Sequence, residues 1–113
     1  MQVEVRIQGT DLADAVRSYA ARRIHFALWR FAPRVGRVQI RLSDVNGTRG
    51  GVDQCCHISA DRLPSGKVVV EQVDADLFAA IDRASERVGQ VFQREIQRVR
   101  DGRTRHESVR QPF

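Results

Sequence analysis

The N-terminal part of the chain changes from a period-two pattern to a helical pattern of apolar residues. Residues 2–8 alternate between polar and β-branched side chains, which predicts a β-strand with one buried face. Over residues 12–31, apolar side chains return every three or four positions, which predicts an amphipathic helix. Residues 9–11 (Gly-Thr-Asp) would form a turn and cap this helix, and Pro33 would end it.

Three further strands are predicted after this helix. Residues 35–45, 54–63 and 67–73 have the period-two pattern of half-buried strands. Asn-Gly and Gly-Gly pairs within residues 46–51 and the Pro-Ser-Gly run at 64–66 are typical of tight turns. We therefore expect these three strands to form an antiparallel meander.

The last predicted element is a long helix. Asp74 would cap it, and apolar residues recur at helical spacing as far as about Arg100. Residues 101–113 lose this periodicity and become polar, so we expect a flexible C-terminal tail. The chain would then consist of one domain, residues 1–100, and the tail at 101–113.

The order of predicted elements, β-α-β-β-β-α, limits the architecture. A helix between the first two strands implies a crossover, so these strands should pair in parallel. Each helix has one apolar stripe, and the economical packing places both helices on one face of a four-stranded sheet. The expected fold class is α+β, a two-layer sandwich.

Composition and length favour a single globular domain. The 113 residues are 42% hydrophobic and 29% charged, and no apolar run reaches the roughly 18 residues that a membrane span needs. The first residues lack the basic flank and apolar block of a secretory signal, so we expect a cytoplasmic protein without a membrane partner.

The charge of the chain is basic and segregated. The net charge is +5, and 18 of the 19 basic residues are Arg, whose guanidinium grips phosphate oxygens in pairs. Residues 15–43 carry +7 without any acid and residues 83–113 carry +4, whereas residues 44–82 carry −4. Two basic blocks around an acidic middle are typical of a one-sided surface for a polyanion.

The second helix carries the clearest basic pattern. Gln90 and four arginines fall on one stripe beside the apolar stripe, at spacings of three and four residues: Arg83, Arg87, Arg94 and Arg98. The functional interpretation is a row that binds successive phosphates. The structural alternative is a solvated face whose arginines pair with Glu86 and Glu95.

The first helix predicts a second basic surface that includes an aromatic residue. Arg22, His25 and Trp29 share one side of this helix, and Arg30 lies at the same end. Such a surface can hold phosphates and stack on a base. The alternative is that Trp29 and its neighbour Phe26 pack against the other helix.

The sequence gives little support for a metal site or an enzyme active site. Cys55-Cys56-His57 lies on a predicted strand, where neighbours point to opposite faces, so we expect Cys56 in the core and Cys55 at the surface. No ligand spacing completes a tetrahedral metal site, and no phosphate-binding loop or catalytic triad spacing is present. We expect no enzyme activity, no cofactor, no metal and no small-molecule substrate.

Three features together resemble a known family. They are the β-α-β-β-β-α order, the segment Asp74-Ala75-Asp76-Leu77-Phe78-Ala79-Ala80-Ile81-Asp82 with the Arg-rich helix after it, and a hairpin with Leu42-Ser43-Asp44-Val45-Asn46-Gly47 before Gly50-Gly51 and Asp53. The chain resembles the short single-domain form of the ribosome hibernation factors, also called the ribosome-associated inhibitor or sigma-54 modulation family. Phe78 stands where the family usually has Tyr.

The resemblance implies a function. A protein of this family would bind 16S rRNA of the 30S ribosomal subunit between head and body, in the path of mRNA and tRNA, and would stop translation as part of ribosome hibernation under stress. By the same resemblance, the contacting residues would be Arg22, Arg30, Arg83, Arg87, Arg94 and Arg98.

Two other functions are compatible with the sequence. One is a generic RNA-binding domain that recognises duplex RNA by shape. The other is a protein-interaction module that modulates a transcription factor or a signalling protein, as the older family name implies.

Overall fold

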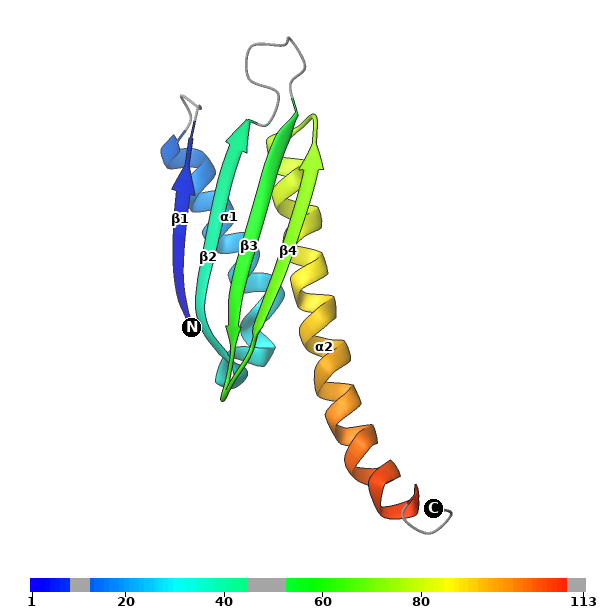
Figure 1. Cartoon of the computed structure of the whole chain (residues 1–113). Coiled ribbons are helices and arrows are strands. Elements are labelled where there is room, and N and C mark those ends of the chain that lie inside the picture. The colour runs from blue at the N-terminus through cyan, green and yellow to red at the C-terminus, as the bar shows by residue number, and fades with distance from the viewer. Residues whose placement is uncertain (9–12, 45–52, 110–113) are drawn as a thin grey trace.

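The computed structural model describes residues 1–8, 13–44 and 53–109. Four strands and two helices follow one another in the predicted order, with one short 3-10 helix after the first α-helix (Figure 1). Their bounds are β1 Gln2–Ile7, α1 Ala13–Leu28, η1 Trp29–Arg34, β2 Val35–Asp44, β3 Gln54–Arg62, β4 Lys67–Asp74 and α2 Leu77–Val109.

The strands form one mixed sheet in the order β1-β2-β3-β4. β1 pairs in parallel with β2, whereas β2 with β3 and β3 with β4 pair antiparallel, which confirms the predicted meander. The predicted turns at 9–11 and 46–51 lie outside the described residues. The turn at 64–66 is confirmed: Gly66 adopts φ +104°, a conformation that favours glycine, and its carbonyl accepts a 2.9 Å hydrogen bond from the Arg62 amide.

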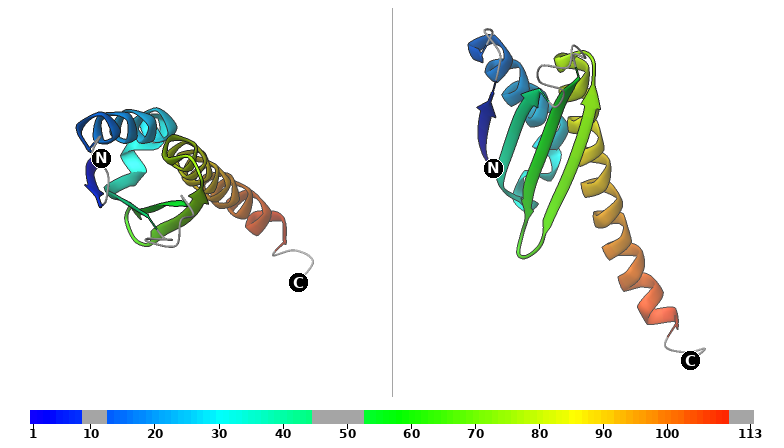
Figure 2. Two further views of the ribbon diagram at one scale, coloured as in Figure 1. Left: turned by 90° about the horizontal axis from the view of Figure 1, so that it is seen from above. Right: turned by 45° about the horizontal axis from the view of Figure 1, so that its top comes forward.

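Both helices lie side by side on the same face of the sheet (Figure 2). The core fills the space between the two layers and has contributions from every strand and helix. In the strands it contains Val5, Val35, Val38, Ile40, Leu42, Cys56, Ile58, Ala60, Val68 and Val70. The predicted two-layer α+β sandwich is therefore confirmed.

The α1 helix ends earlier than the sequence pattern predicted. It ends at Leu28 rather than near residue 31, and its buried stripe is Val16, Ala20, Ile24 and Leu28. The chain then tightens into η1 because the ring of Pro33, placed in an α-helix, would clash with the carbonyl group of Trp29. This change of geometry places Phe31 in the core.

The start of α2 is capped two residues later than predicted. The Asp76 carboxylate accepts a 3.0 Å hydrogen bond from the Phe78 amide, as an N-cap does. Asp74 instead accepts a 3.0 Å hydrogen bond from the Asp76 amide and so stabilises the turn before the helix.

The far end of α2 extends beyond the predicted boundary at Arg100, to Val109. The helix there runs past the end of the sheet (Figure 1). Residues 101–109 contain no proline, and a single Gly102 is tolerated in a helix. The loss of apolar periodicity after residue 100 therefore marks the end of contact with the sheet rather than the end of the helix.

Candidate nucleic-acid interface

The outward face of α1 carries the predicted basic residues. Arg22 and His25 are exposed and make no hydrogen bond or ion pair within the described part of the chain. Trp29, the first residue of η1, is 66% exposed. The structure therefore brings these three side chains to one solvent-facing surface.

The alternative interpretation of the aromatic residues is wrong. Phe26 is 74% exposed and Trp29 is 66% exposed, so neither ring is buried against α2. The aromatic contact between the helices is instead made by Tyr19 and Phe78, whose ring centroids lie 4.9 Å apart in an edge-on arrangement.

Polar contacts at the top of the helix pair fix α1 against α2. The Tyr19 hydroxyl donates a 2.5 Å hydrogen bond to Asp82, and the Arg23 Nε lies 3.2 Å from the same carboxylate oxygen. The hydrogen bond to Asp82 stabilises the protonated phenol and raises the pKa of Tyr19 above its ordinary value. Arg23 thus has a structural partner, in contrast to Arg22.

The first two arginines of the α2 stripe contact β4. Arg83 lies 3.5 Å from an oxygen of Asp74, and Arg87 donates 3.0 Å hydrogen bonds to the Glu71 carbonyl and to Gln72. These two arginines attach α2 to β4 and its end while their side chains remain largely exposed.

The lower half of the stripe is free of such contacts. Arg94 and Arg98 are exposed, and within the described residues they have no hydrogen-bond or ion-pair partner. The pairs with Glu86 and Glu95 that the structural alternative required are not formed: Glu86 accepts a 3.4 Å hydrogen bond from Gln90, and Glu95 pairs with Arg62. Two guanidinium groups are therefore available to phosphates.

The predicted residues thus form two groups, both on the helix layer. One group lies on the outward face of α1, and the other on the side of α2 that faces β4. Arg30 lies between them, since its Nη2 donates to Gln93 Oε1 of α2 at 3.3 Å and its guanidinium lies over the ring of Phe31.

A groove between the helices was not predicted from the sequence. It has a volume of about 360 Å³ and is lined by Arg23, Phe26, Ala27, Trp29, Arg30, Glu86, Gly89, Gln90 and Gln93. We call it the interhelix groove. One sequence signal could have indicated it: Gly89 lies inside a helix, where glycine is unfavourable unless another backbone approaches closely.

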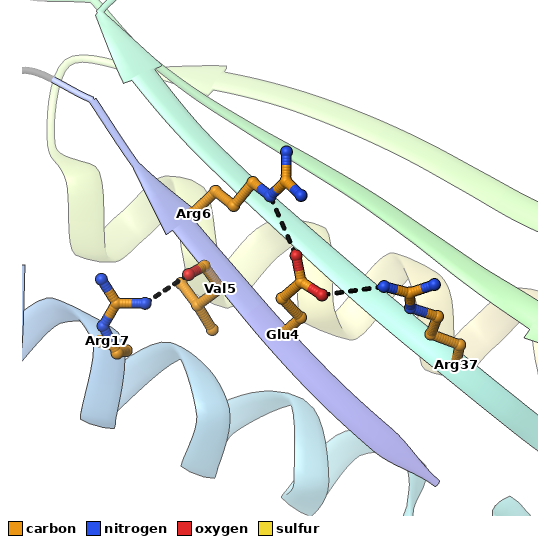
Figure 3. A network of polar contacts seen from close by, with 5 residues as sticks. All are labelled: Glu4, Val5, Arg6, Arg17 and Arg37. Atoms are coloured by element: carbon orange, nitrogen blue, oxygen red, sulfur yellow. Dashed lines mark hydrogen bonds and ion pairs between the residues drawn. The ribbon is translucent and has the colours of Figure 1, made fainter.

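On the opposite, open face of the sheet, two arginines are paired with a carboxylate. Glu4 on β1 accepts hydrogen bonds from Arg6 at 2.9 Å and from Arg37 at 3.0 Å (Figure 3). These hydrogen bonds, the one from Arg37 above all, lower the pKa of Glu4. Arg17 of α1 donates to the Val5 carbonyl at the same edge. Part of the positive charge on this face is therefore compensated.

The cysteines offer no reactive site. Cys56 is fully buried as expected, but Cys55 is also buried, at 6% exposure, so its predicted surface position is wrong. In the sheet register Cys55 stands opposite Ser43 of β2 and Val73 of β4. Burial raises the pKa of Cys56 to about 12, which disfavours the reactive thiolate.

The described part of the chain has neither a cluster of metal ligands nor a helix that could cross a membrane. No three His, Cys, Asp or Glu side chains come close enough together there to hold a metal ion. Among the same residues, no helix is both long enough and apolar enough to span a bilayer.

Comparisons with known proteins agree with the architecture. The N-terminal domain of Protein Y from Thermus thermophilus is 29% identical to this chain, and the match covers 83% of this chain and 98% of that one, with a TM-score of 0.67. A ribosomal subunit interface protein from Coxiella burnetii has the same fold, with a TM-score of 0.70, 13% identity, and coverage of 86% and 99%. A comparison with curated protein sequences found no match.

The family assignment rests on a match over most of the chain. The model of the family described as sigma 54 modulation protein / S30EA ribosomal protein matches residues 3–100, a range that includes all four strands, α1 and most of α2. The chain belongs to the sigma 54 modulation protein / S30EA ribosomal protein family.

Proposed function

We propose that this protein is a ribosome-associated factor that binds 16S rRNA of the 30S subunit through its helix layer and silences translation. One observation carries this proposal: four basic residues are exposed on the helix layer and have no hydrogen-bond or ion-pair partner among the described residues, namely Arg22 and His25 on α1 and Arg94 and Arg98 on α2. Guanidinium groups held in this way are well suited to phosphate oxygens. The family membership and the subunit interface protein with the same fold make the ribosome the favoured source of those phosphates.

The proposed action is binding rather than catalysis. The protein would occupy the path of mRNA and tRNA in the small subunit and would need no cofactor and no small-molecule substrate. It would act in the cytoplasm, where ribosomes are found. Binding would be mainly electrostatic, because each phosphate that an arginine neutralises releases counterions.

Within the chain, residues 1–100 would form the ribosome-binding domain and residues 101–113 an auxiliary tail. The tail has three arginines, Arg103, Arg105 and Arg110, which would add non-specific attraction to rRNA. Residues 101–109 continue α2 past the end of the sheet, so we expect their net contribution to be smaller than that of residues 1–100.

Co-sedimentation with purified 30S subunits tests this proposal. The protein should sediment with the subunits at low salt, and an excess of duplex RNA should not displace it. If duplex RNA displaces it completely, the protein recognises the shape of RNA helices in general. The family description also names sigma 54 modulation. If the protein instead ignores 30S and binds a protein partner through high salt and nuclease treatment, it is an interaction module.

A further inference from the structure

The interhelix groove combines aromatic side chains with charged and polar ones. Two large aromatic side chains, Phe26 and Trp29, stand exposed on its α1 side, three residues apart. Exposed aromatic rings that cluster beside a concave, polar surface mark binding sites more often than chance. None of the packing contacts described above accounts for them.

The floor of the groove is backbone rather than side chain. Gly89 is buried, and a Cβ atom at that position would lie 3.1 Å from the Ala27 carbonyl oxygen and 3.7 Å from its Cβ. The two helices can therefore approach closely at this level, and the larger side chains on either side form walls around a shallow floor.

The polar lining of the groove differs between its two sides. Arg23 and Arg30 supply positive charge, which attracts RNA, while Glu86 supplies a carboxylate. Gln93 uses its Oε1 to accept from Arg30, and Gln90 uses its Nε2 to donate to Glu86. Glu86 repels a phosphate from the groove itself but can accept hydrogen bonds from the N–H groups of a base.

The position of the cations indicates which ring is open to a ligand. The guanidinium of Arg23 lies 6.0 Å from the centroid of the Phe26 ring, and that of Arg30 lies 5.1 Å from the centroid of Phe31. Within the described residues no cation lies over Trp29 in the same way. Trp29 is therefore the aromatic surface on which a base can stack.

We infer that the interhelix groove receives one unpaired RNA base, stacked on Trp29 and hydrogen-bonded to Glu86, with guanine preferred. This rests on the proposed function, because the ligand is RNA. Guanine is the base whose Watson–Crick edge presents two adjacent N–H donors, which match the two oxygens of a carboxylate. Unpaired bases in RNA loops are commonly recognised in this way, by stacking and by hydrogen bonds to this edge.

The fluorescence of Trp29, the sole tryptophan of the chain, reports directly on such stacking. The probe is a short single-stranded oligouridine with one central guanosine, compared with the same strand carrying adenosine, cytidine or uridine at that place. We expect the guanosine strand to quench Trp29 and to bind about tenfold more tightly than the others, as a bidentate contact allows.

The variant Glu86→Gln isolates the base contact, and Asp14→Asn removes a negative charge from the start of α1 as a matched control. Both residues are exposed, so both variants should fold. Glu86→Gln should abolish the preference for guanosine while quenching persists, and Asp14→Asn should leave both unchanged. Equal affinity for all four strands, or a guanosine preference that survives in Glu86→Gln, would overturn the inference.

The failure of this inference can be told apart from that of the proposed function. If the protein sediments with 30S subunits but no oligonucleotide quenches Trp29, the groove is not a base site, while the ribosome-binding proposal stands. If guanosine strands quench Trp29 but 30S subunits are not bound, the groove assignment is supported and the ribosome proposal fails.

Discussion

Gly89 of α2 lies directly against the backbone of Ala27 in α1, since a Cβ atom on Gly89 would be 3.1 Å from the Ala27 carbonyl oxygen. That separation is shorter than ordinary van der Waals contact, so even the Cβ atom of an alanine at position 89 would require the Ala27 backbone to shift by a few tenths of an ångström. The same contact forms the floor of the interhelix groove. Gly89 therefore contributes both to the packing of α1 against α2 and to the candidate base site.

Replacing Gly89 with Leu should destabilise the protein. The added side chain has to push α1 and α2 apart, and overpacking of this kind costs about 1–3 kcal/mol. The gain in helix propensity, at most about 1 kcal/mol, offsets this only in part. We expect a lower free energy of unfolding in urea, whereas Gln97→Leu on an exposed position of the same helix should change it by less than about 0.5 kcal/mol. A stabilised Gly89→Leu variant would show that the helices are not in close contact there.

Replacing Ser85 with Ala should stabilise the protein. Ser85 is fully buried on α2, and within the described residues its hydroxyl has no hydrogen-bond partner. Removing an unsatisfied buried hydroxyl should raise the free energy of unfolding by about 1–3 kcal/mol. Ser18→Ala on the exposed face of α1 is the control. This variant should raise the free energy of unfolding only through its higher helix propensity, by about 0.5 kcal/mol. Equal gains in the two variants would mean that the Ser85 hydroxyl is satisfied.

The fold was predictable because its determinants are local. The alternation in β2 and the helical spacing of Ile81, Ala84 and Val88 report directly which side faces the core. The predicted helix boundaries were less accurate where a single residue determines where the helix begins or ends. Pro33 changes the geometry of the turn before it, and Asp76 competes with Asp74 for the capping position.

The candidate site was only partly predictable because it depends on tertiary contacts. Helical spacing places Arg83, Arg87, Arg94 and Arg98 on one stripe, but it does not reveal that the first two contact β4 and its end while the last two remain free. It also does not reveal the groove, which forms only when α1 and α2 pack side by side. Phe26 is apolar, so the sequence alone suggests that it is buried, but in the packed helix pair it is exposed.

The titration of Tyr19 provides a test of the contact between α1 and α2. Tyr19 is the sole tyrosine, and its hydrogen bond to Asp82 raises its pKa above the ordinary value of about 10. Because the folded-state pKa lies above the unfolded one, this contact stabilises the protein below pH of about 10 and is lost as the pH rises through the folded-state pKa. The ultraviolet absorbance of the phenolate measures this pKa.

The matched variant for this titration is Asp82→Asn, which removes the charge but keeps the size of the side chain. It should lower the pKa of Tyr19 toward its ordinary value. A wild-type pKa at or below about 10, in protein that circular dichroism shows to be folded, would contradict the observed hydrogen bond.

Deleting residues 101–113 should leave the domain folded. Among the side chains that the structure describes, Ile96 is the last one of α2 that packs against the core, and it lies before the deleted segment. We expect the melting temperature to change by less than about 4 °C. Binding to 30S subunits should persist within about tenfold, because the tail arginines add only non-specific attraction. Loss of binding in a folded truncated protein would make the tail the main anchor.

The central claim, that the helix layer binds rRNA, is tested most directly by the 30S affinity of two matched double variants. Arg94→Gln with Arg98→Gln removes from α2 two charges that have no partner among the described residues. Arg6→Gln with Arg41→Gln removes two exposed charges from the open face of the sheet, where Arg6 is paired with Glu4. At about 0.1 M salt each lost phosphate contact should cost roughly tenfold, so the helix variant should bind on the order of a hundredfold more weakly. The sheet variant should bind like the unmodified protein. An equal or greater loss in the sheet variant would contradict the account.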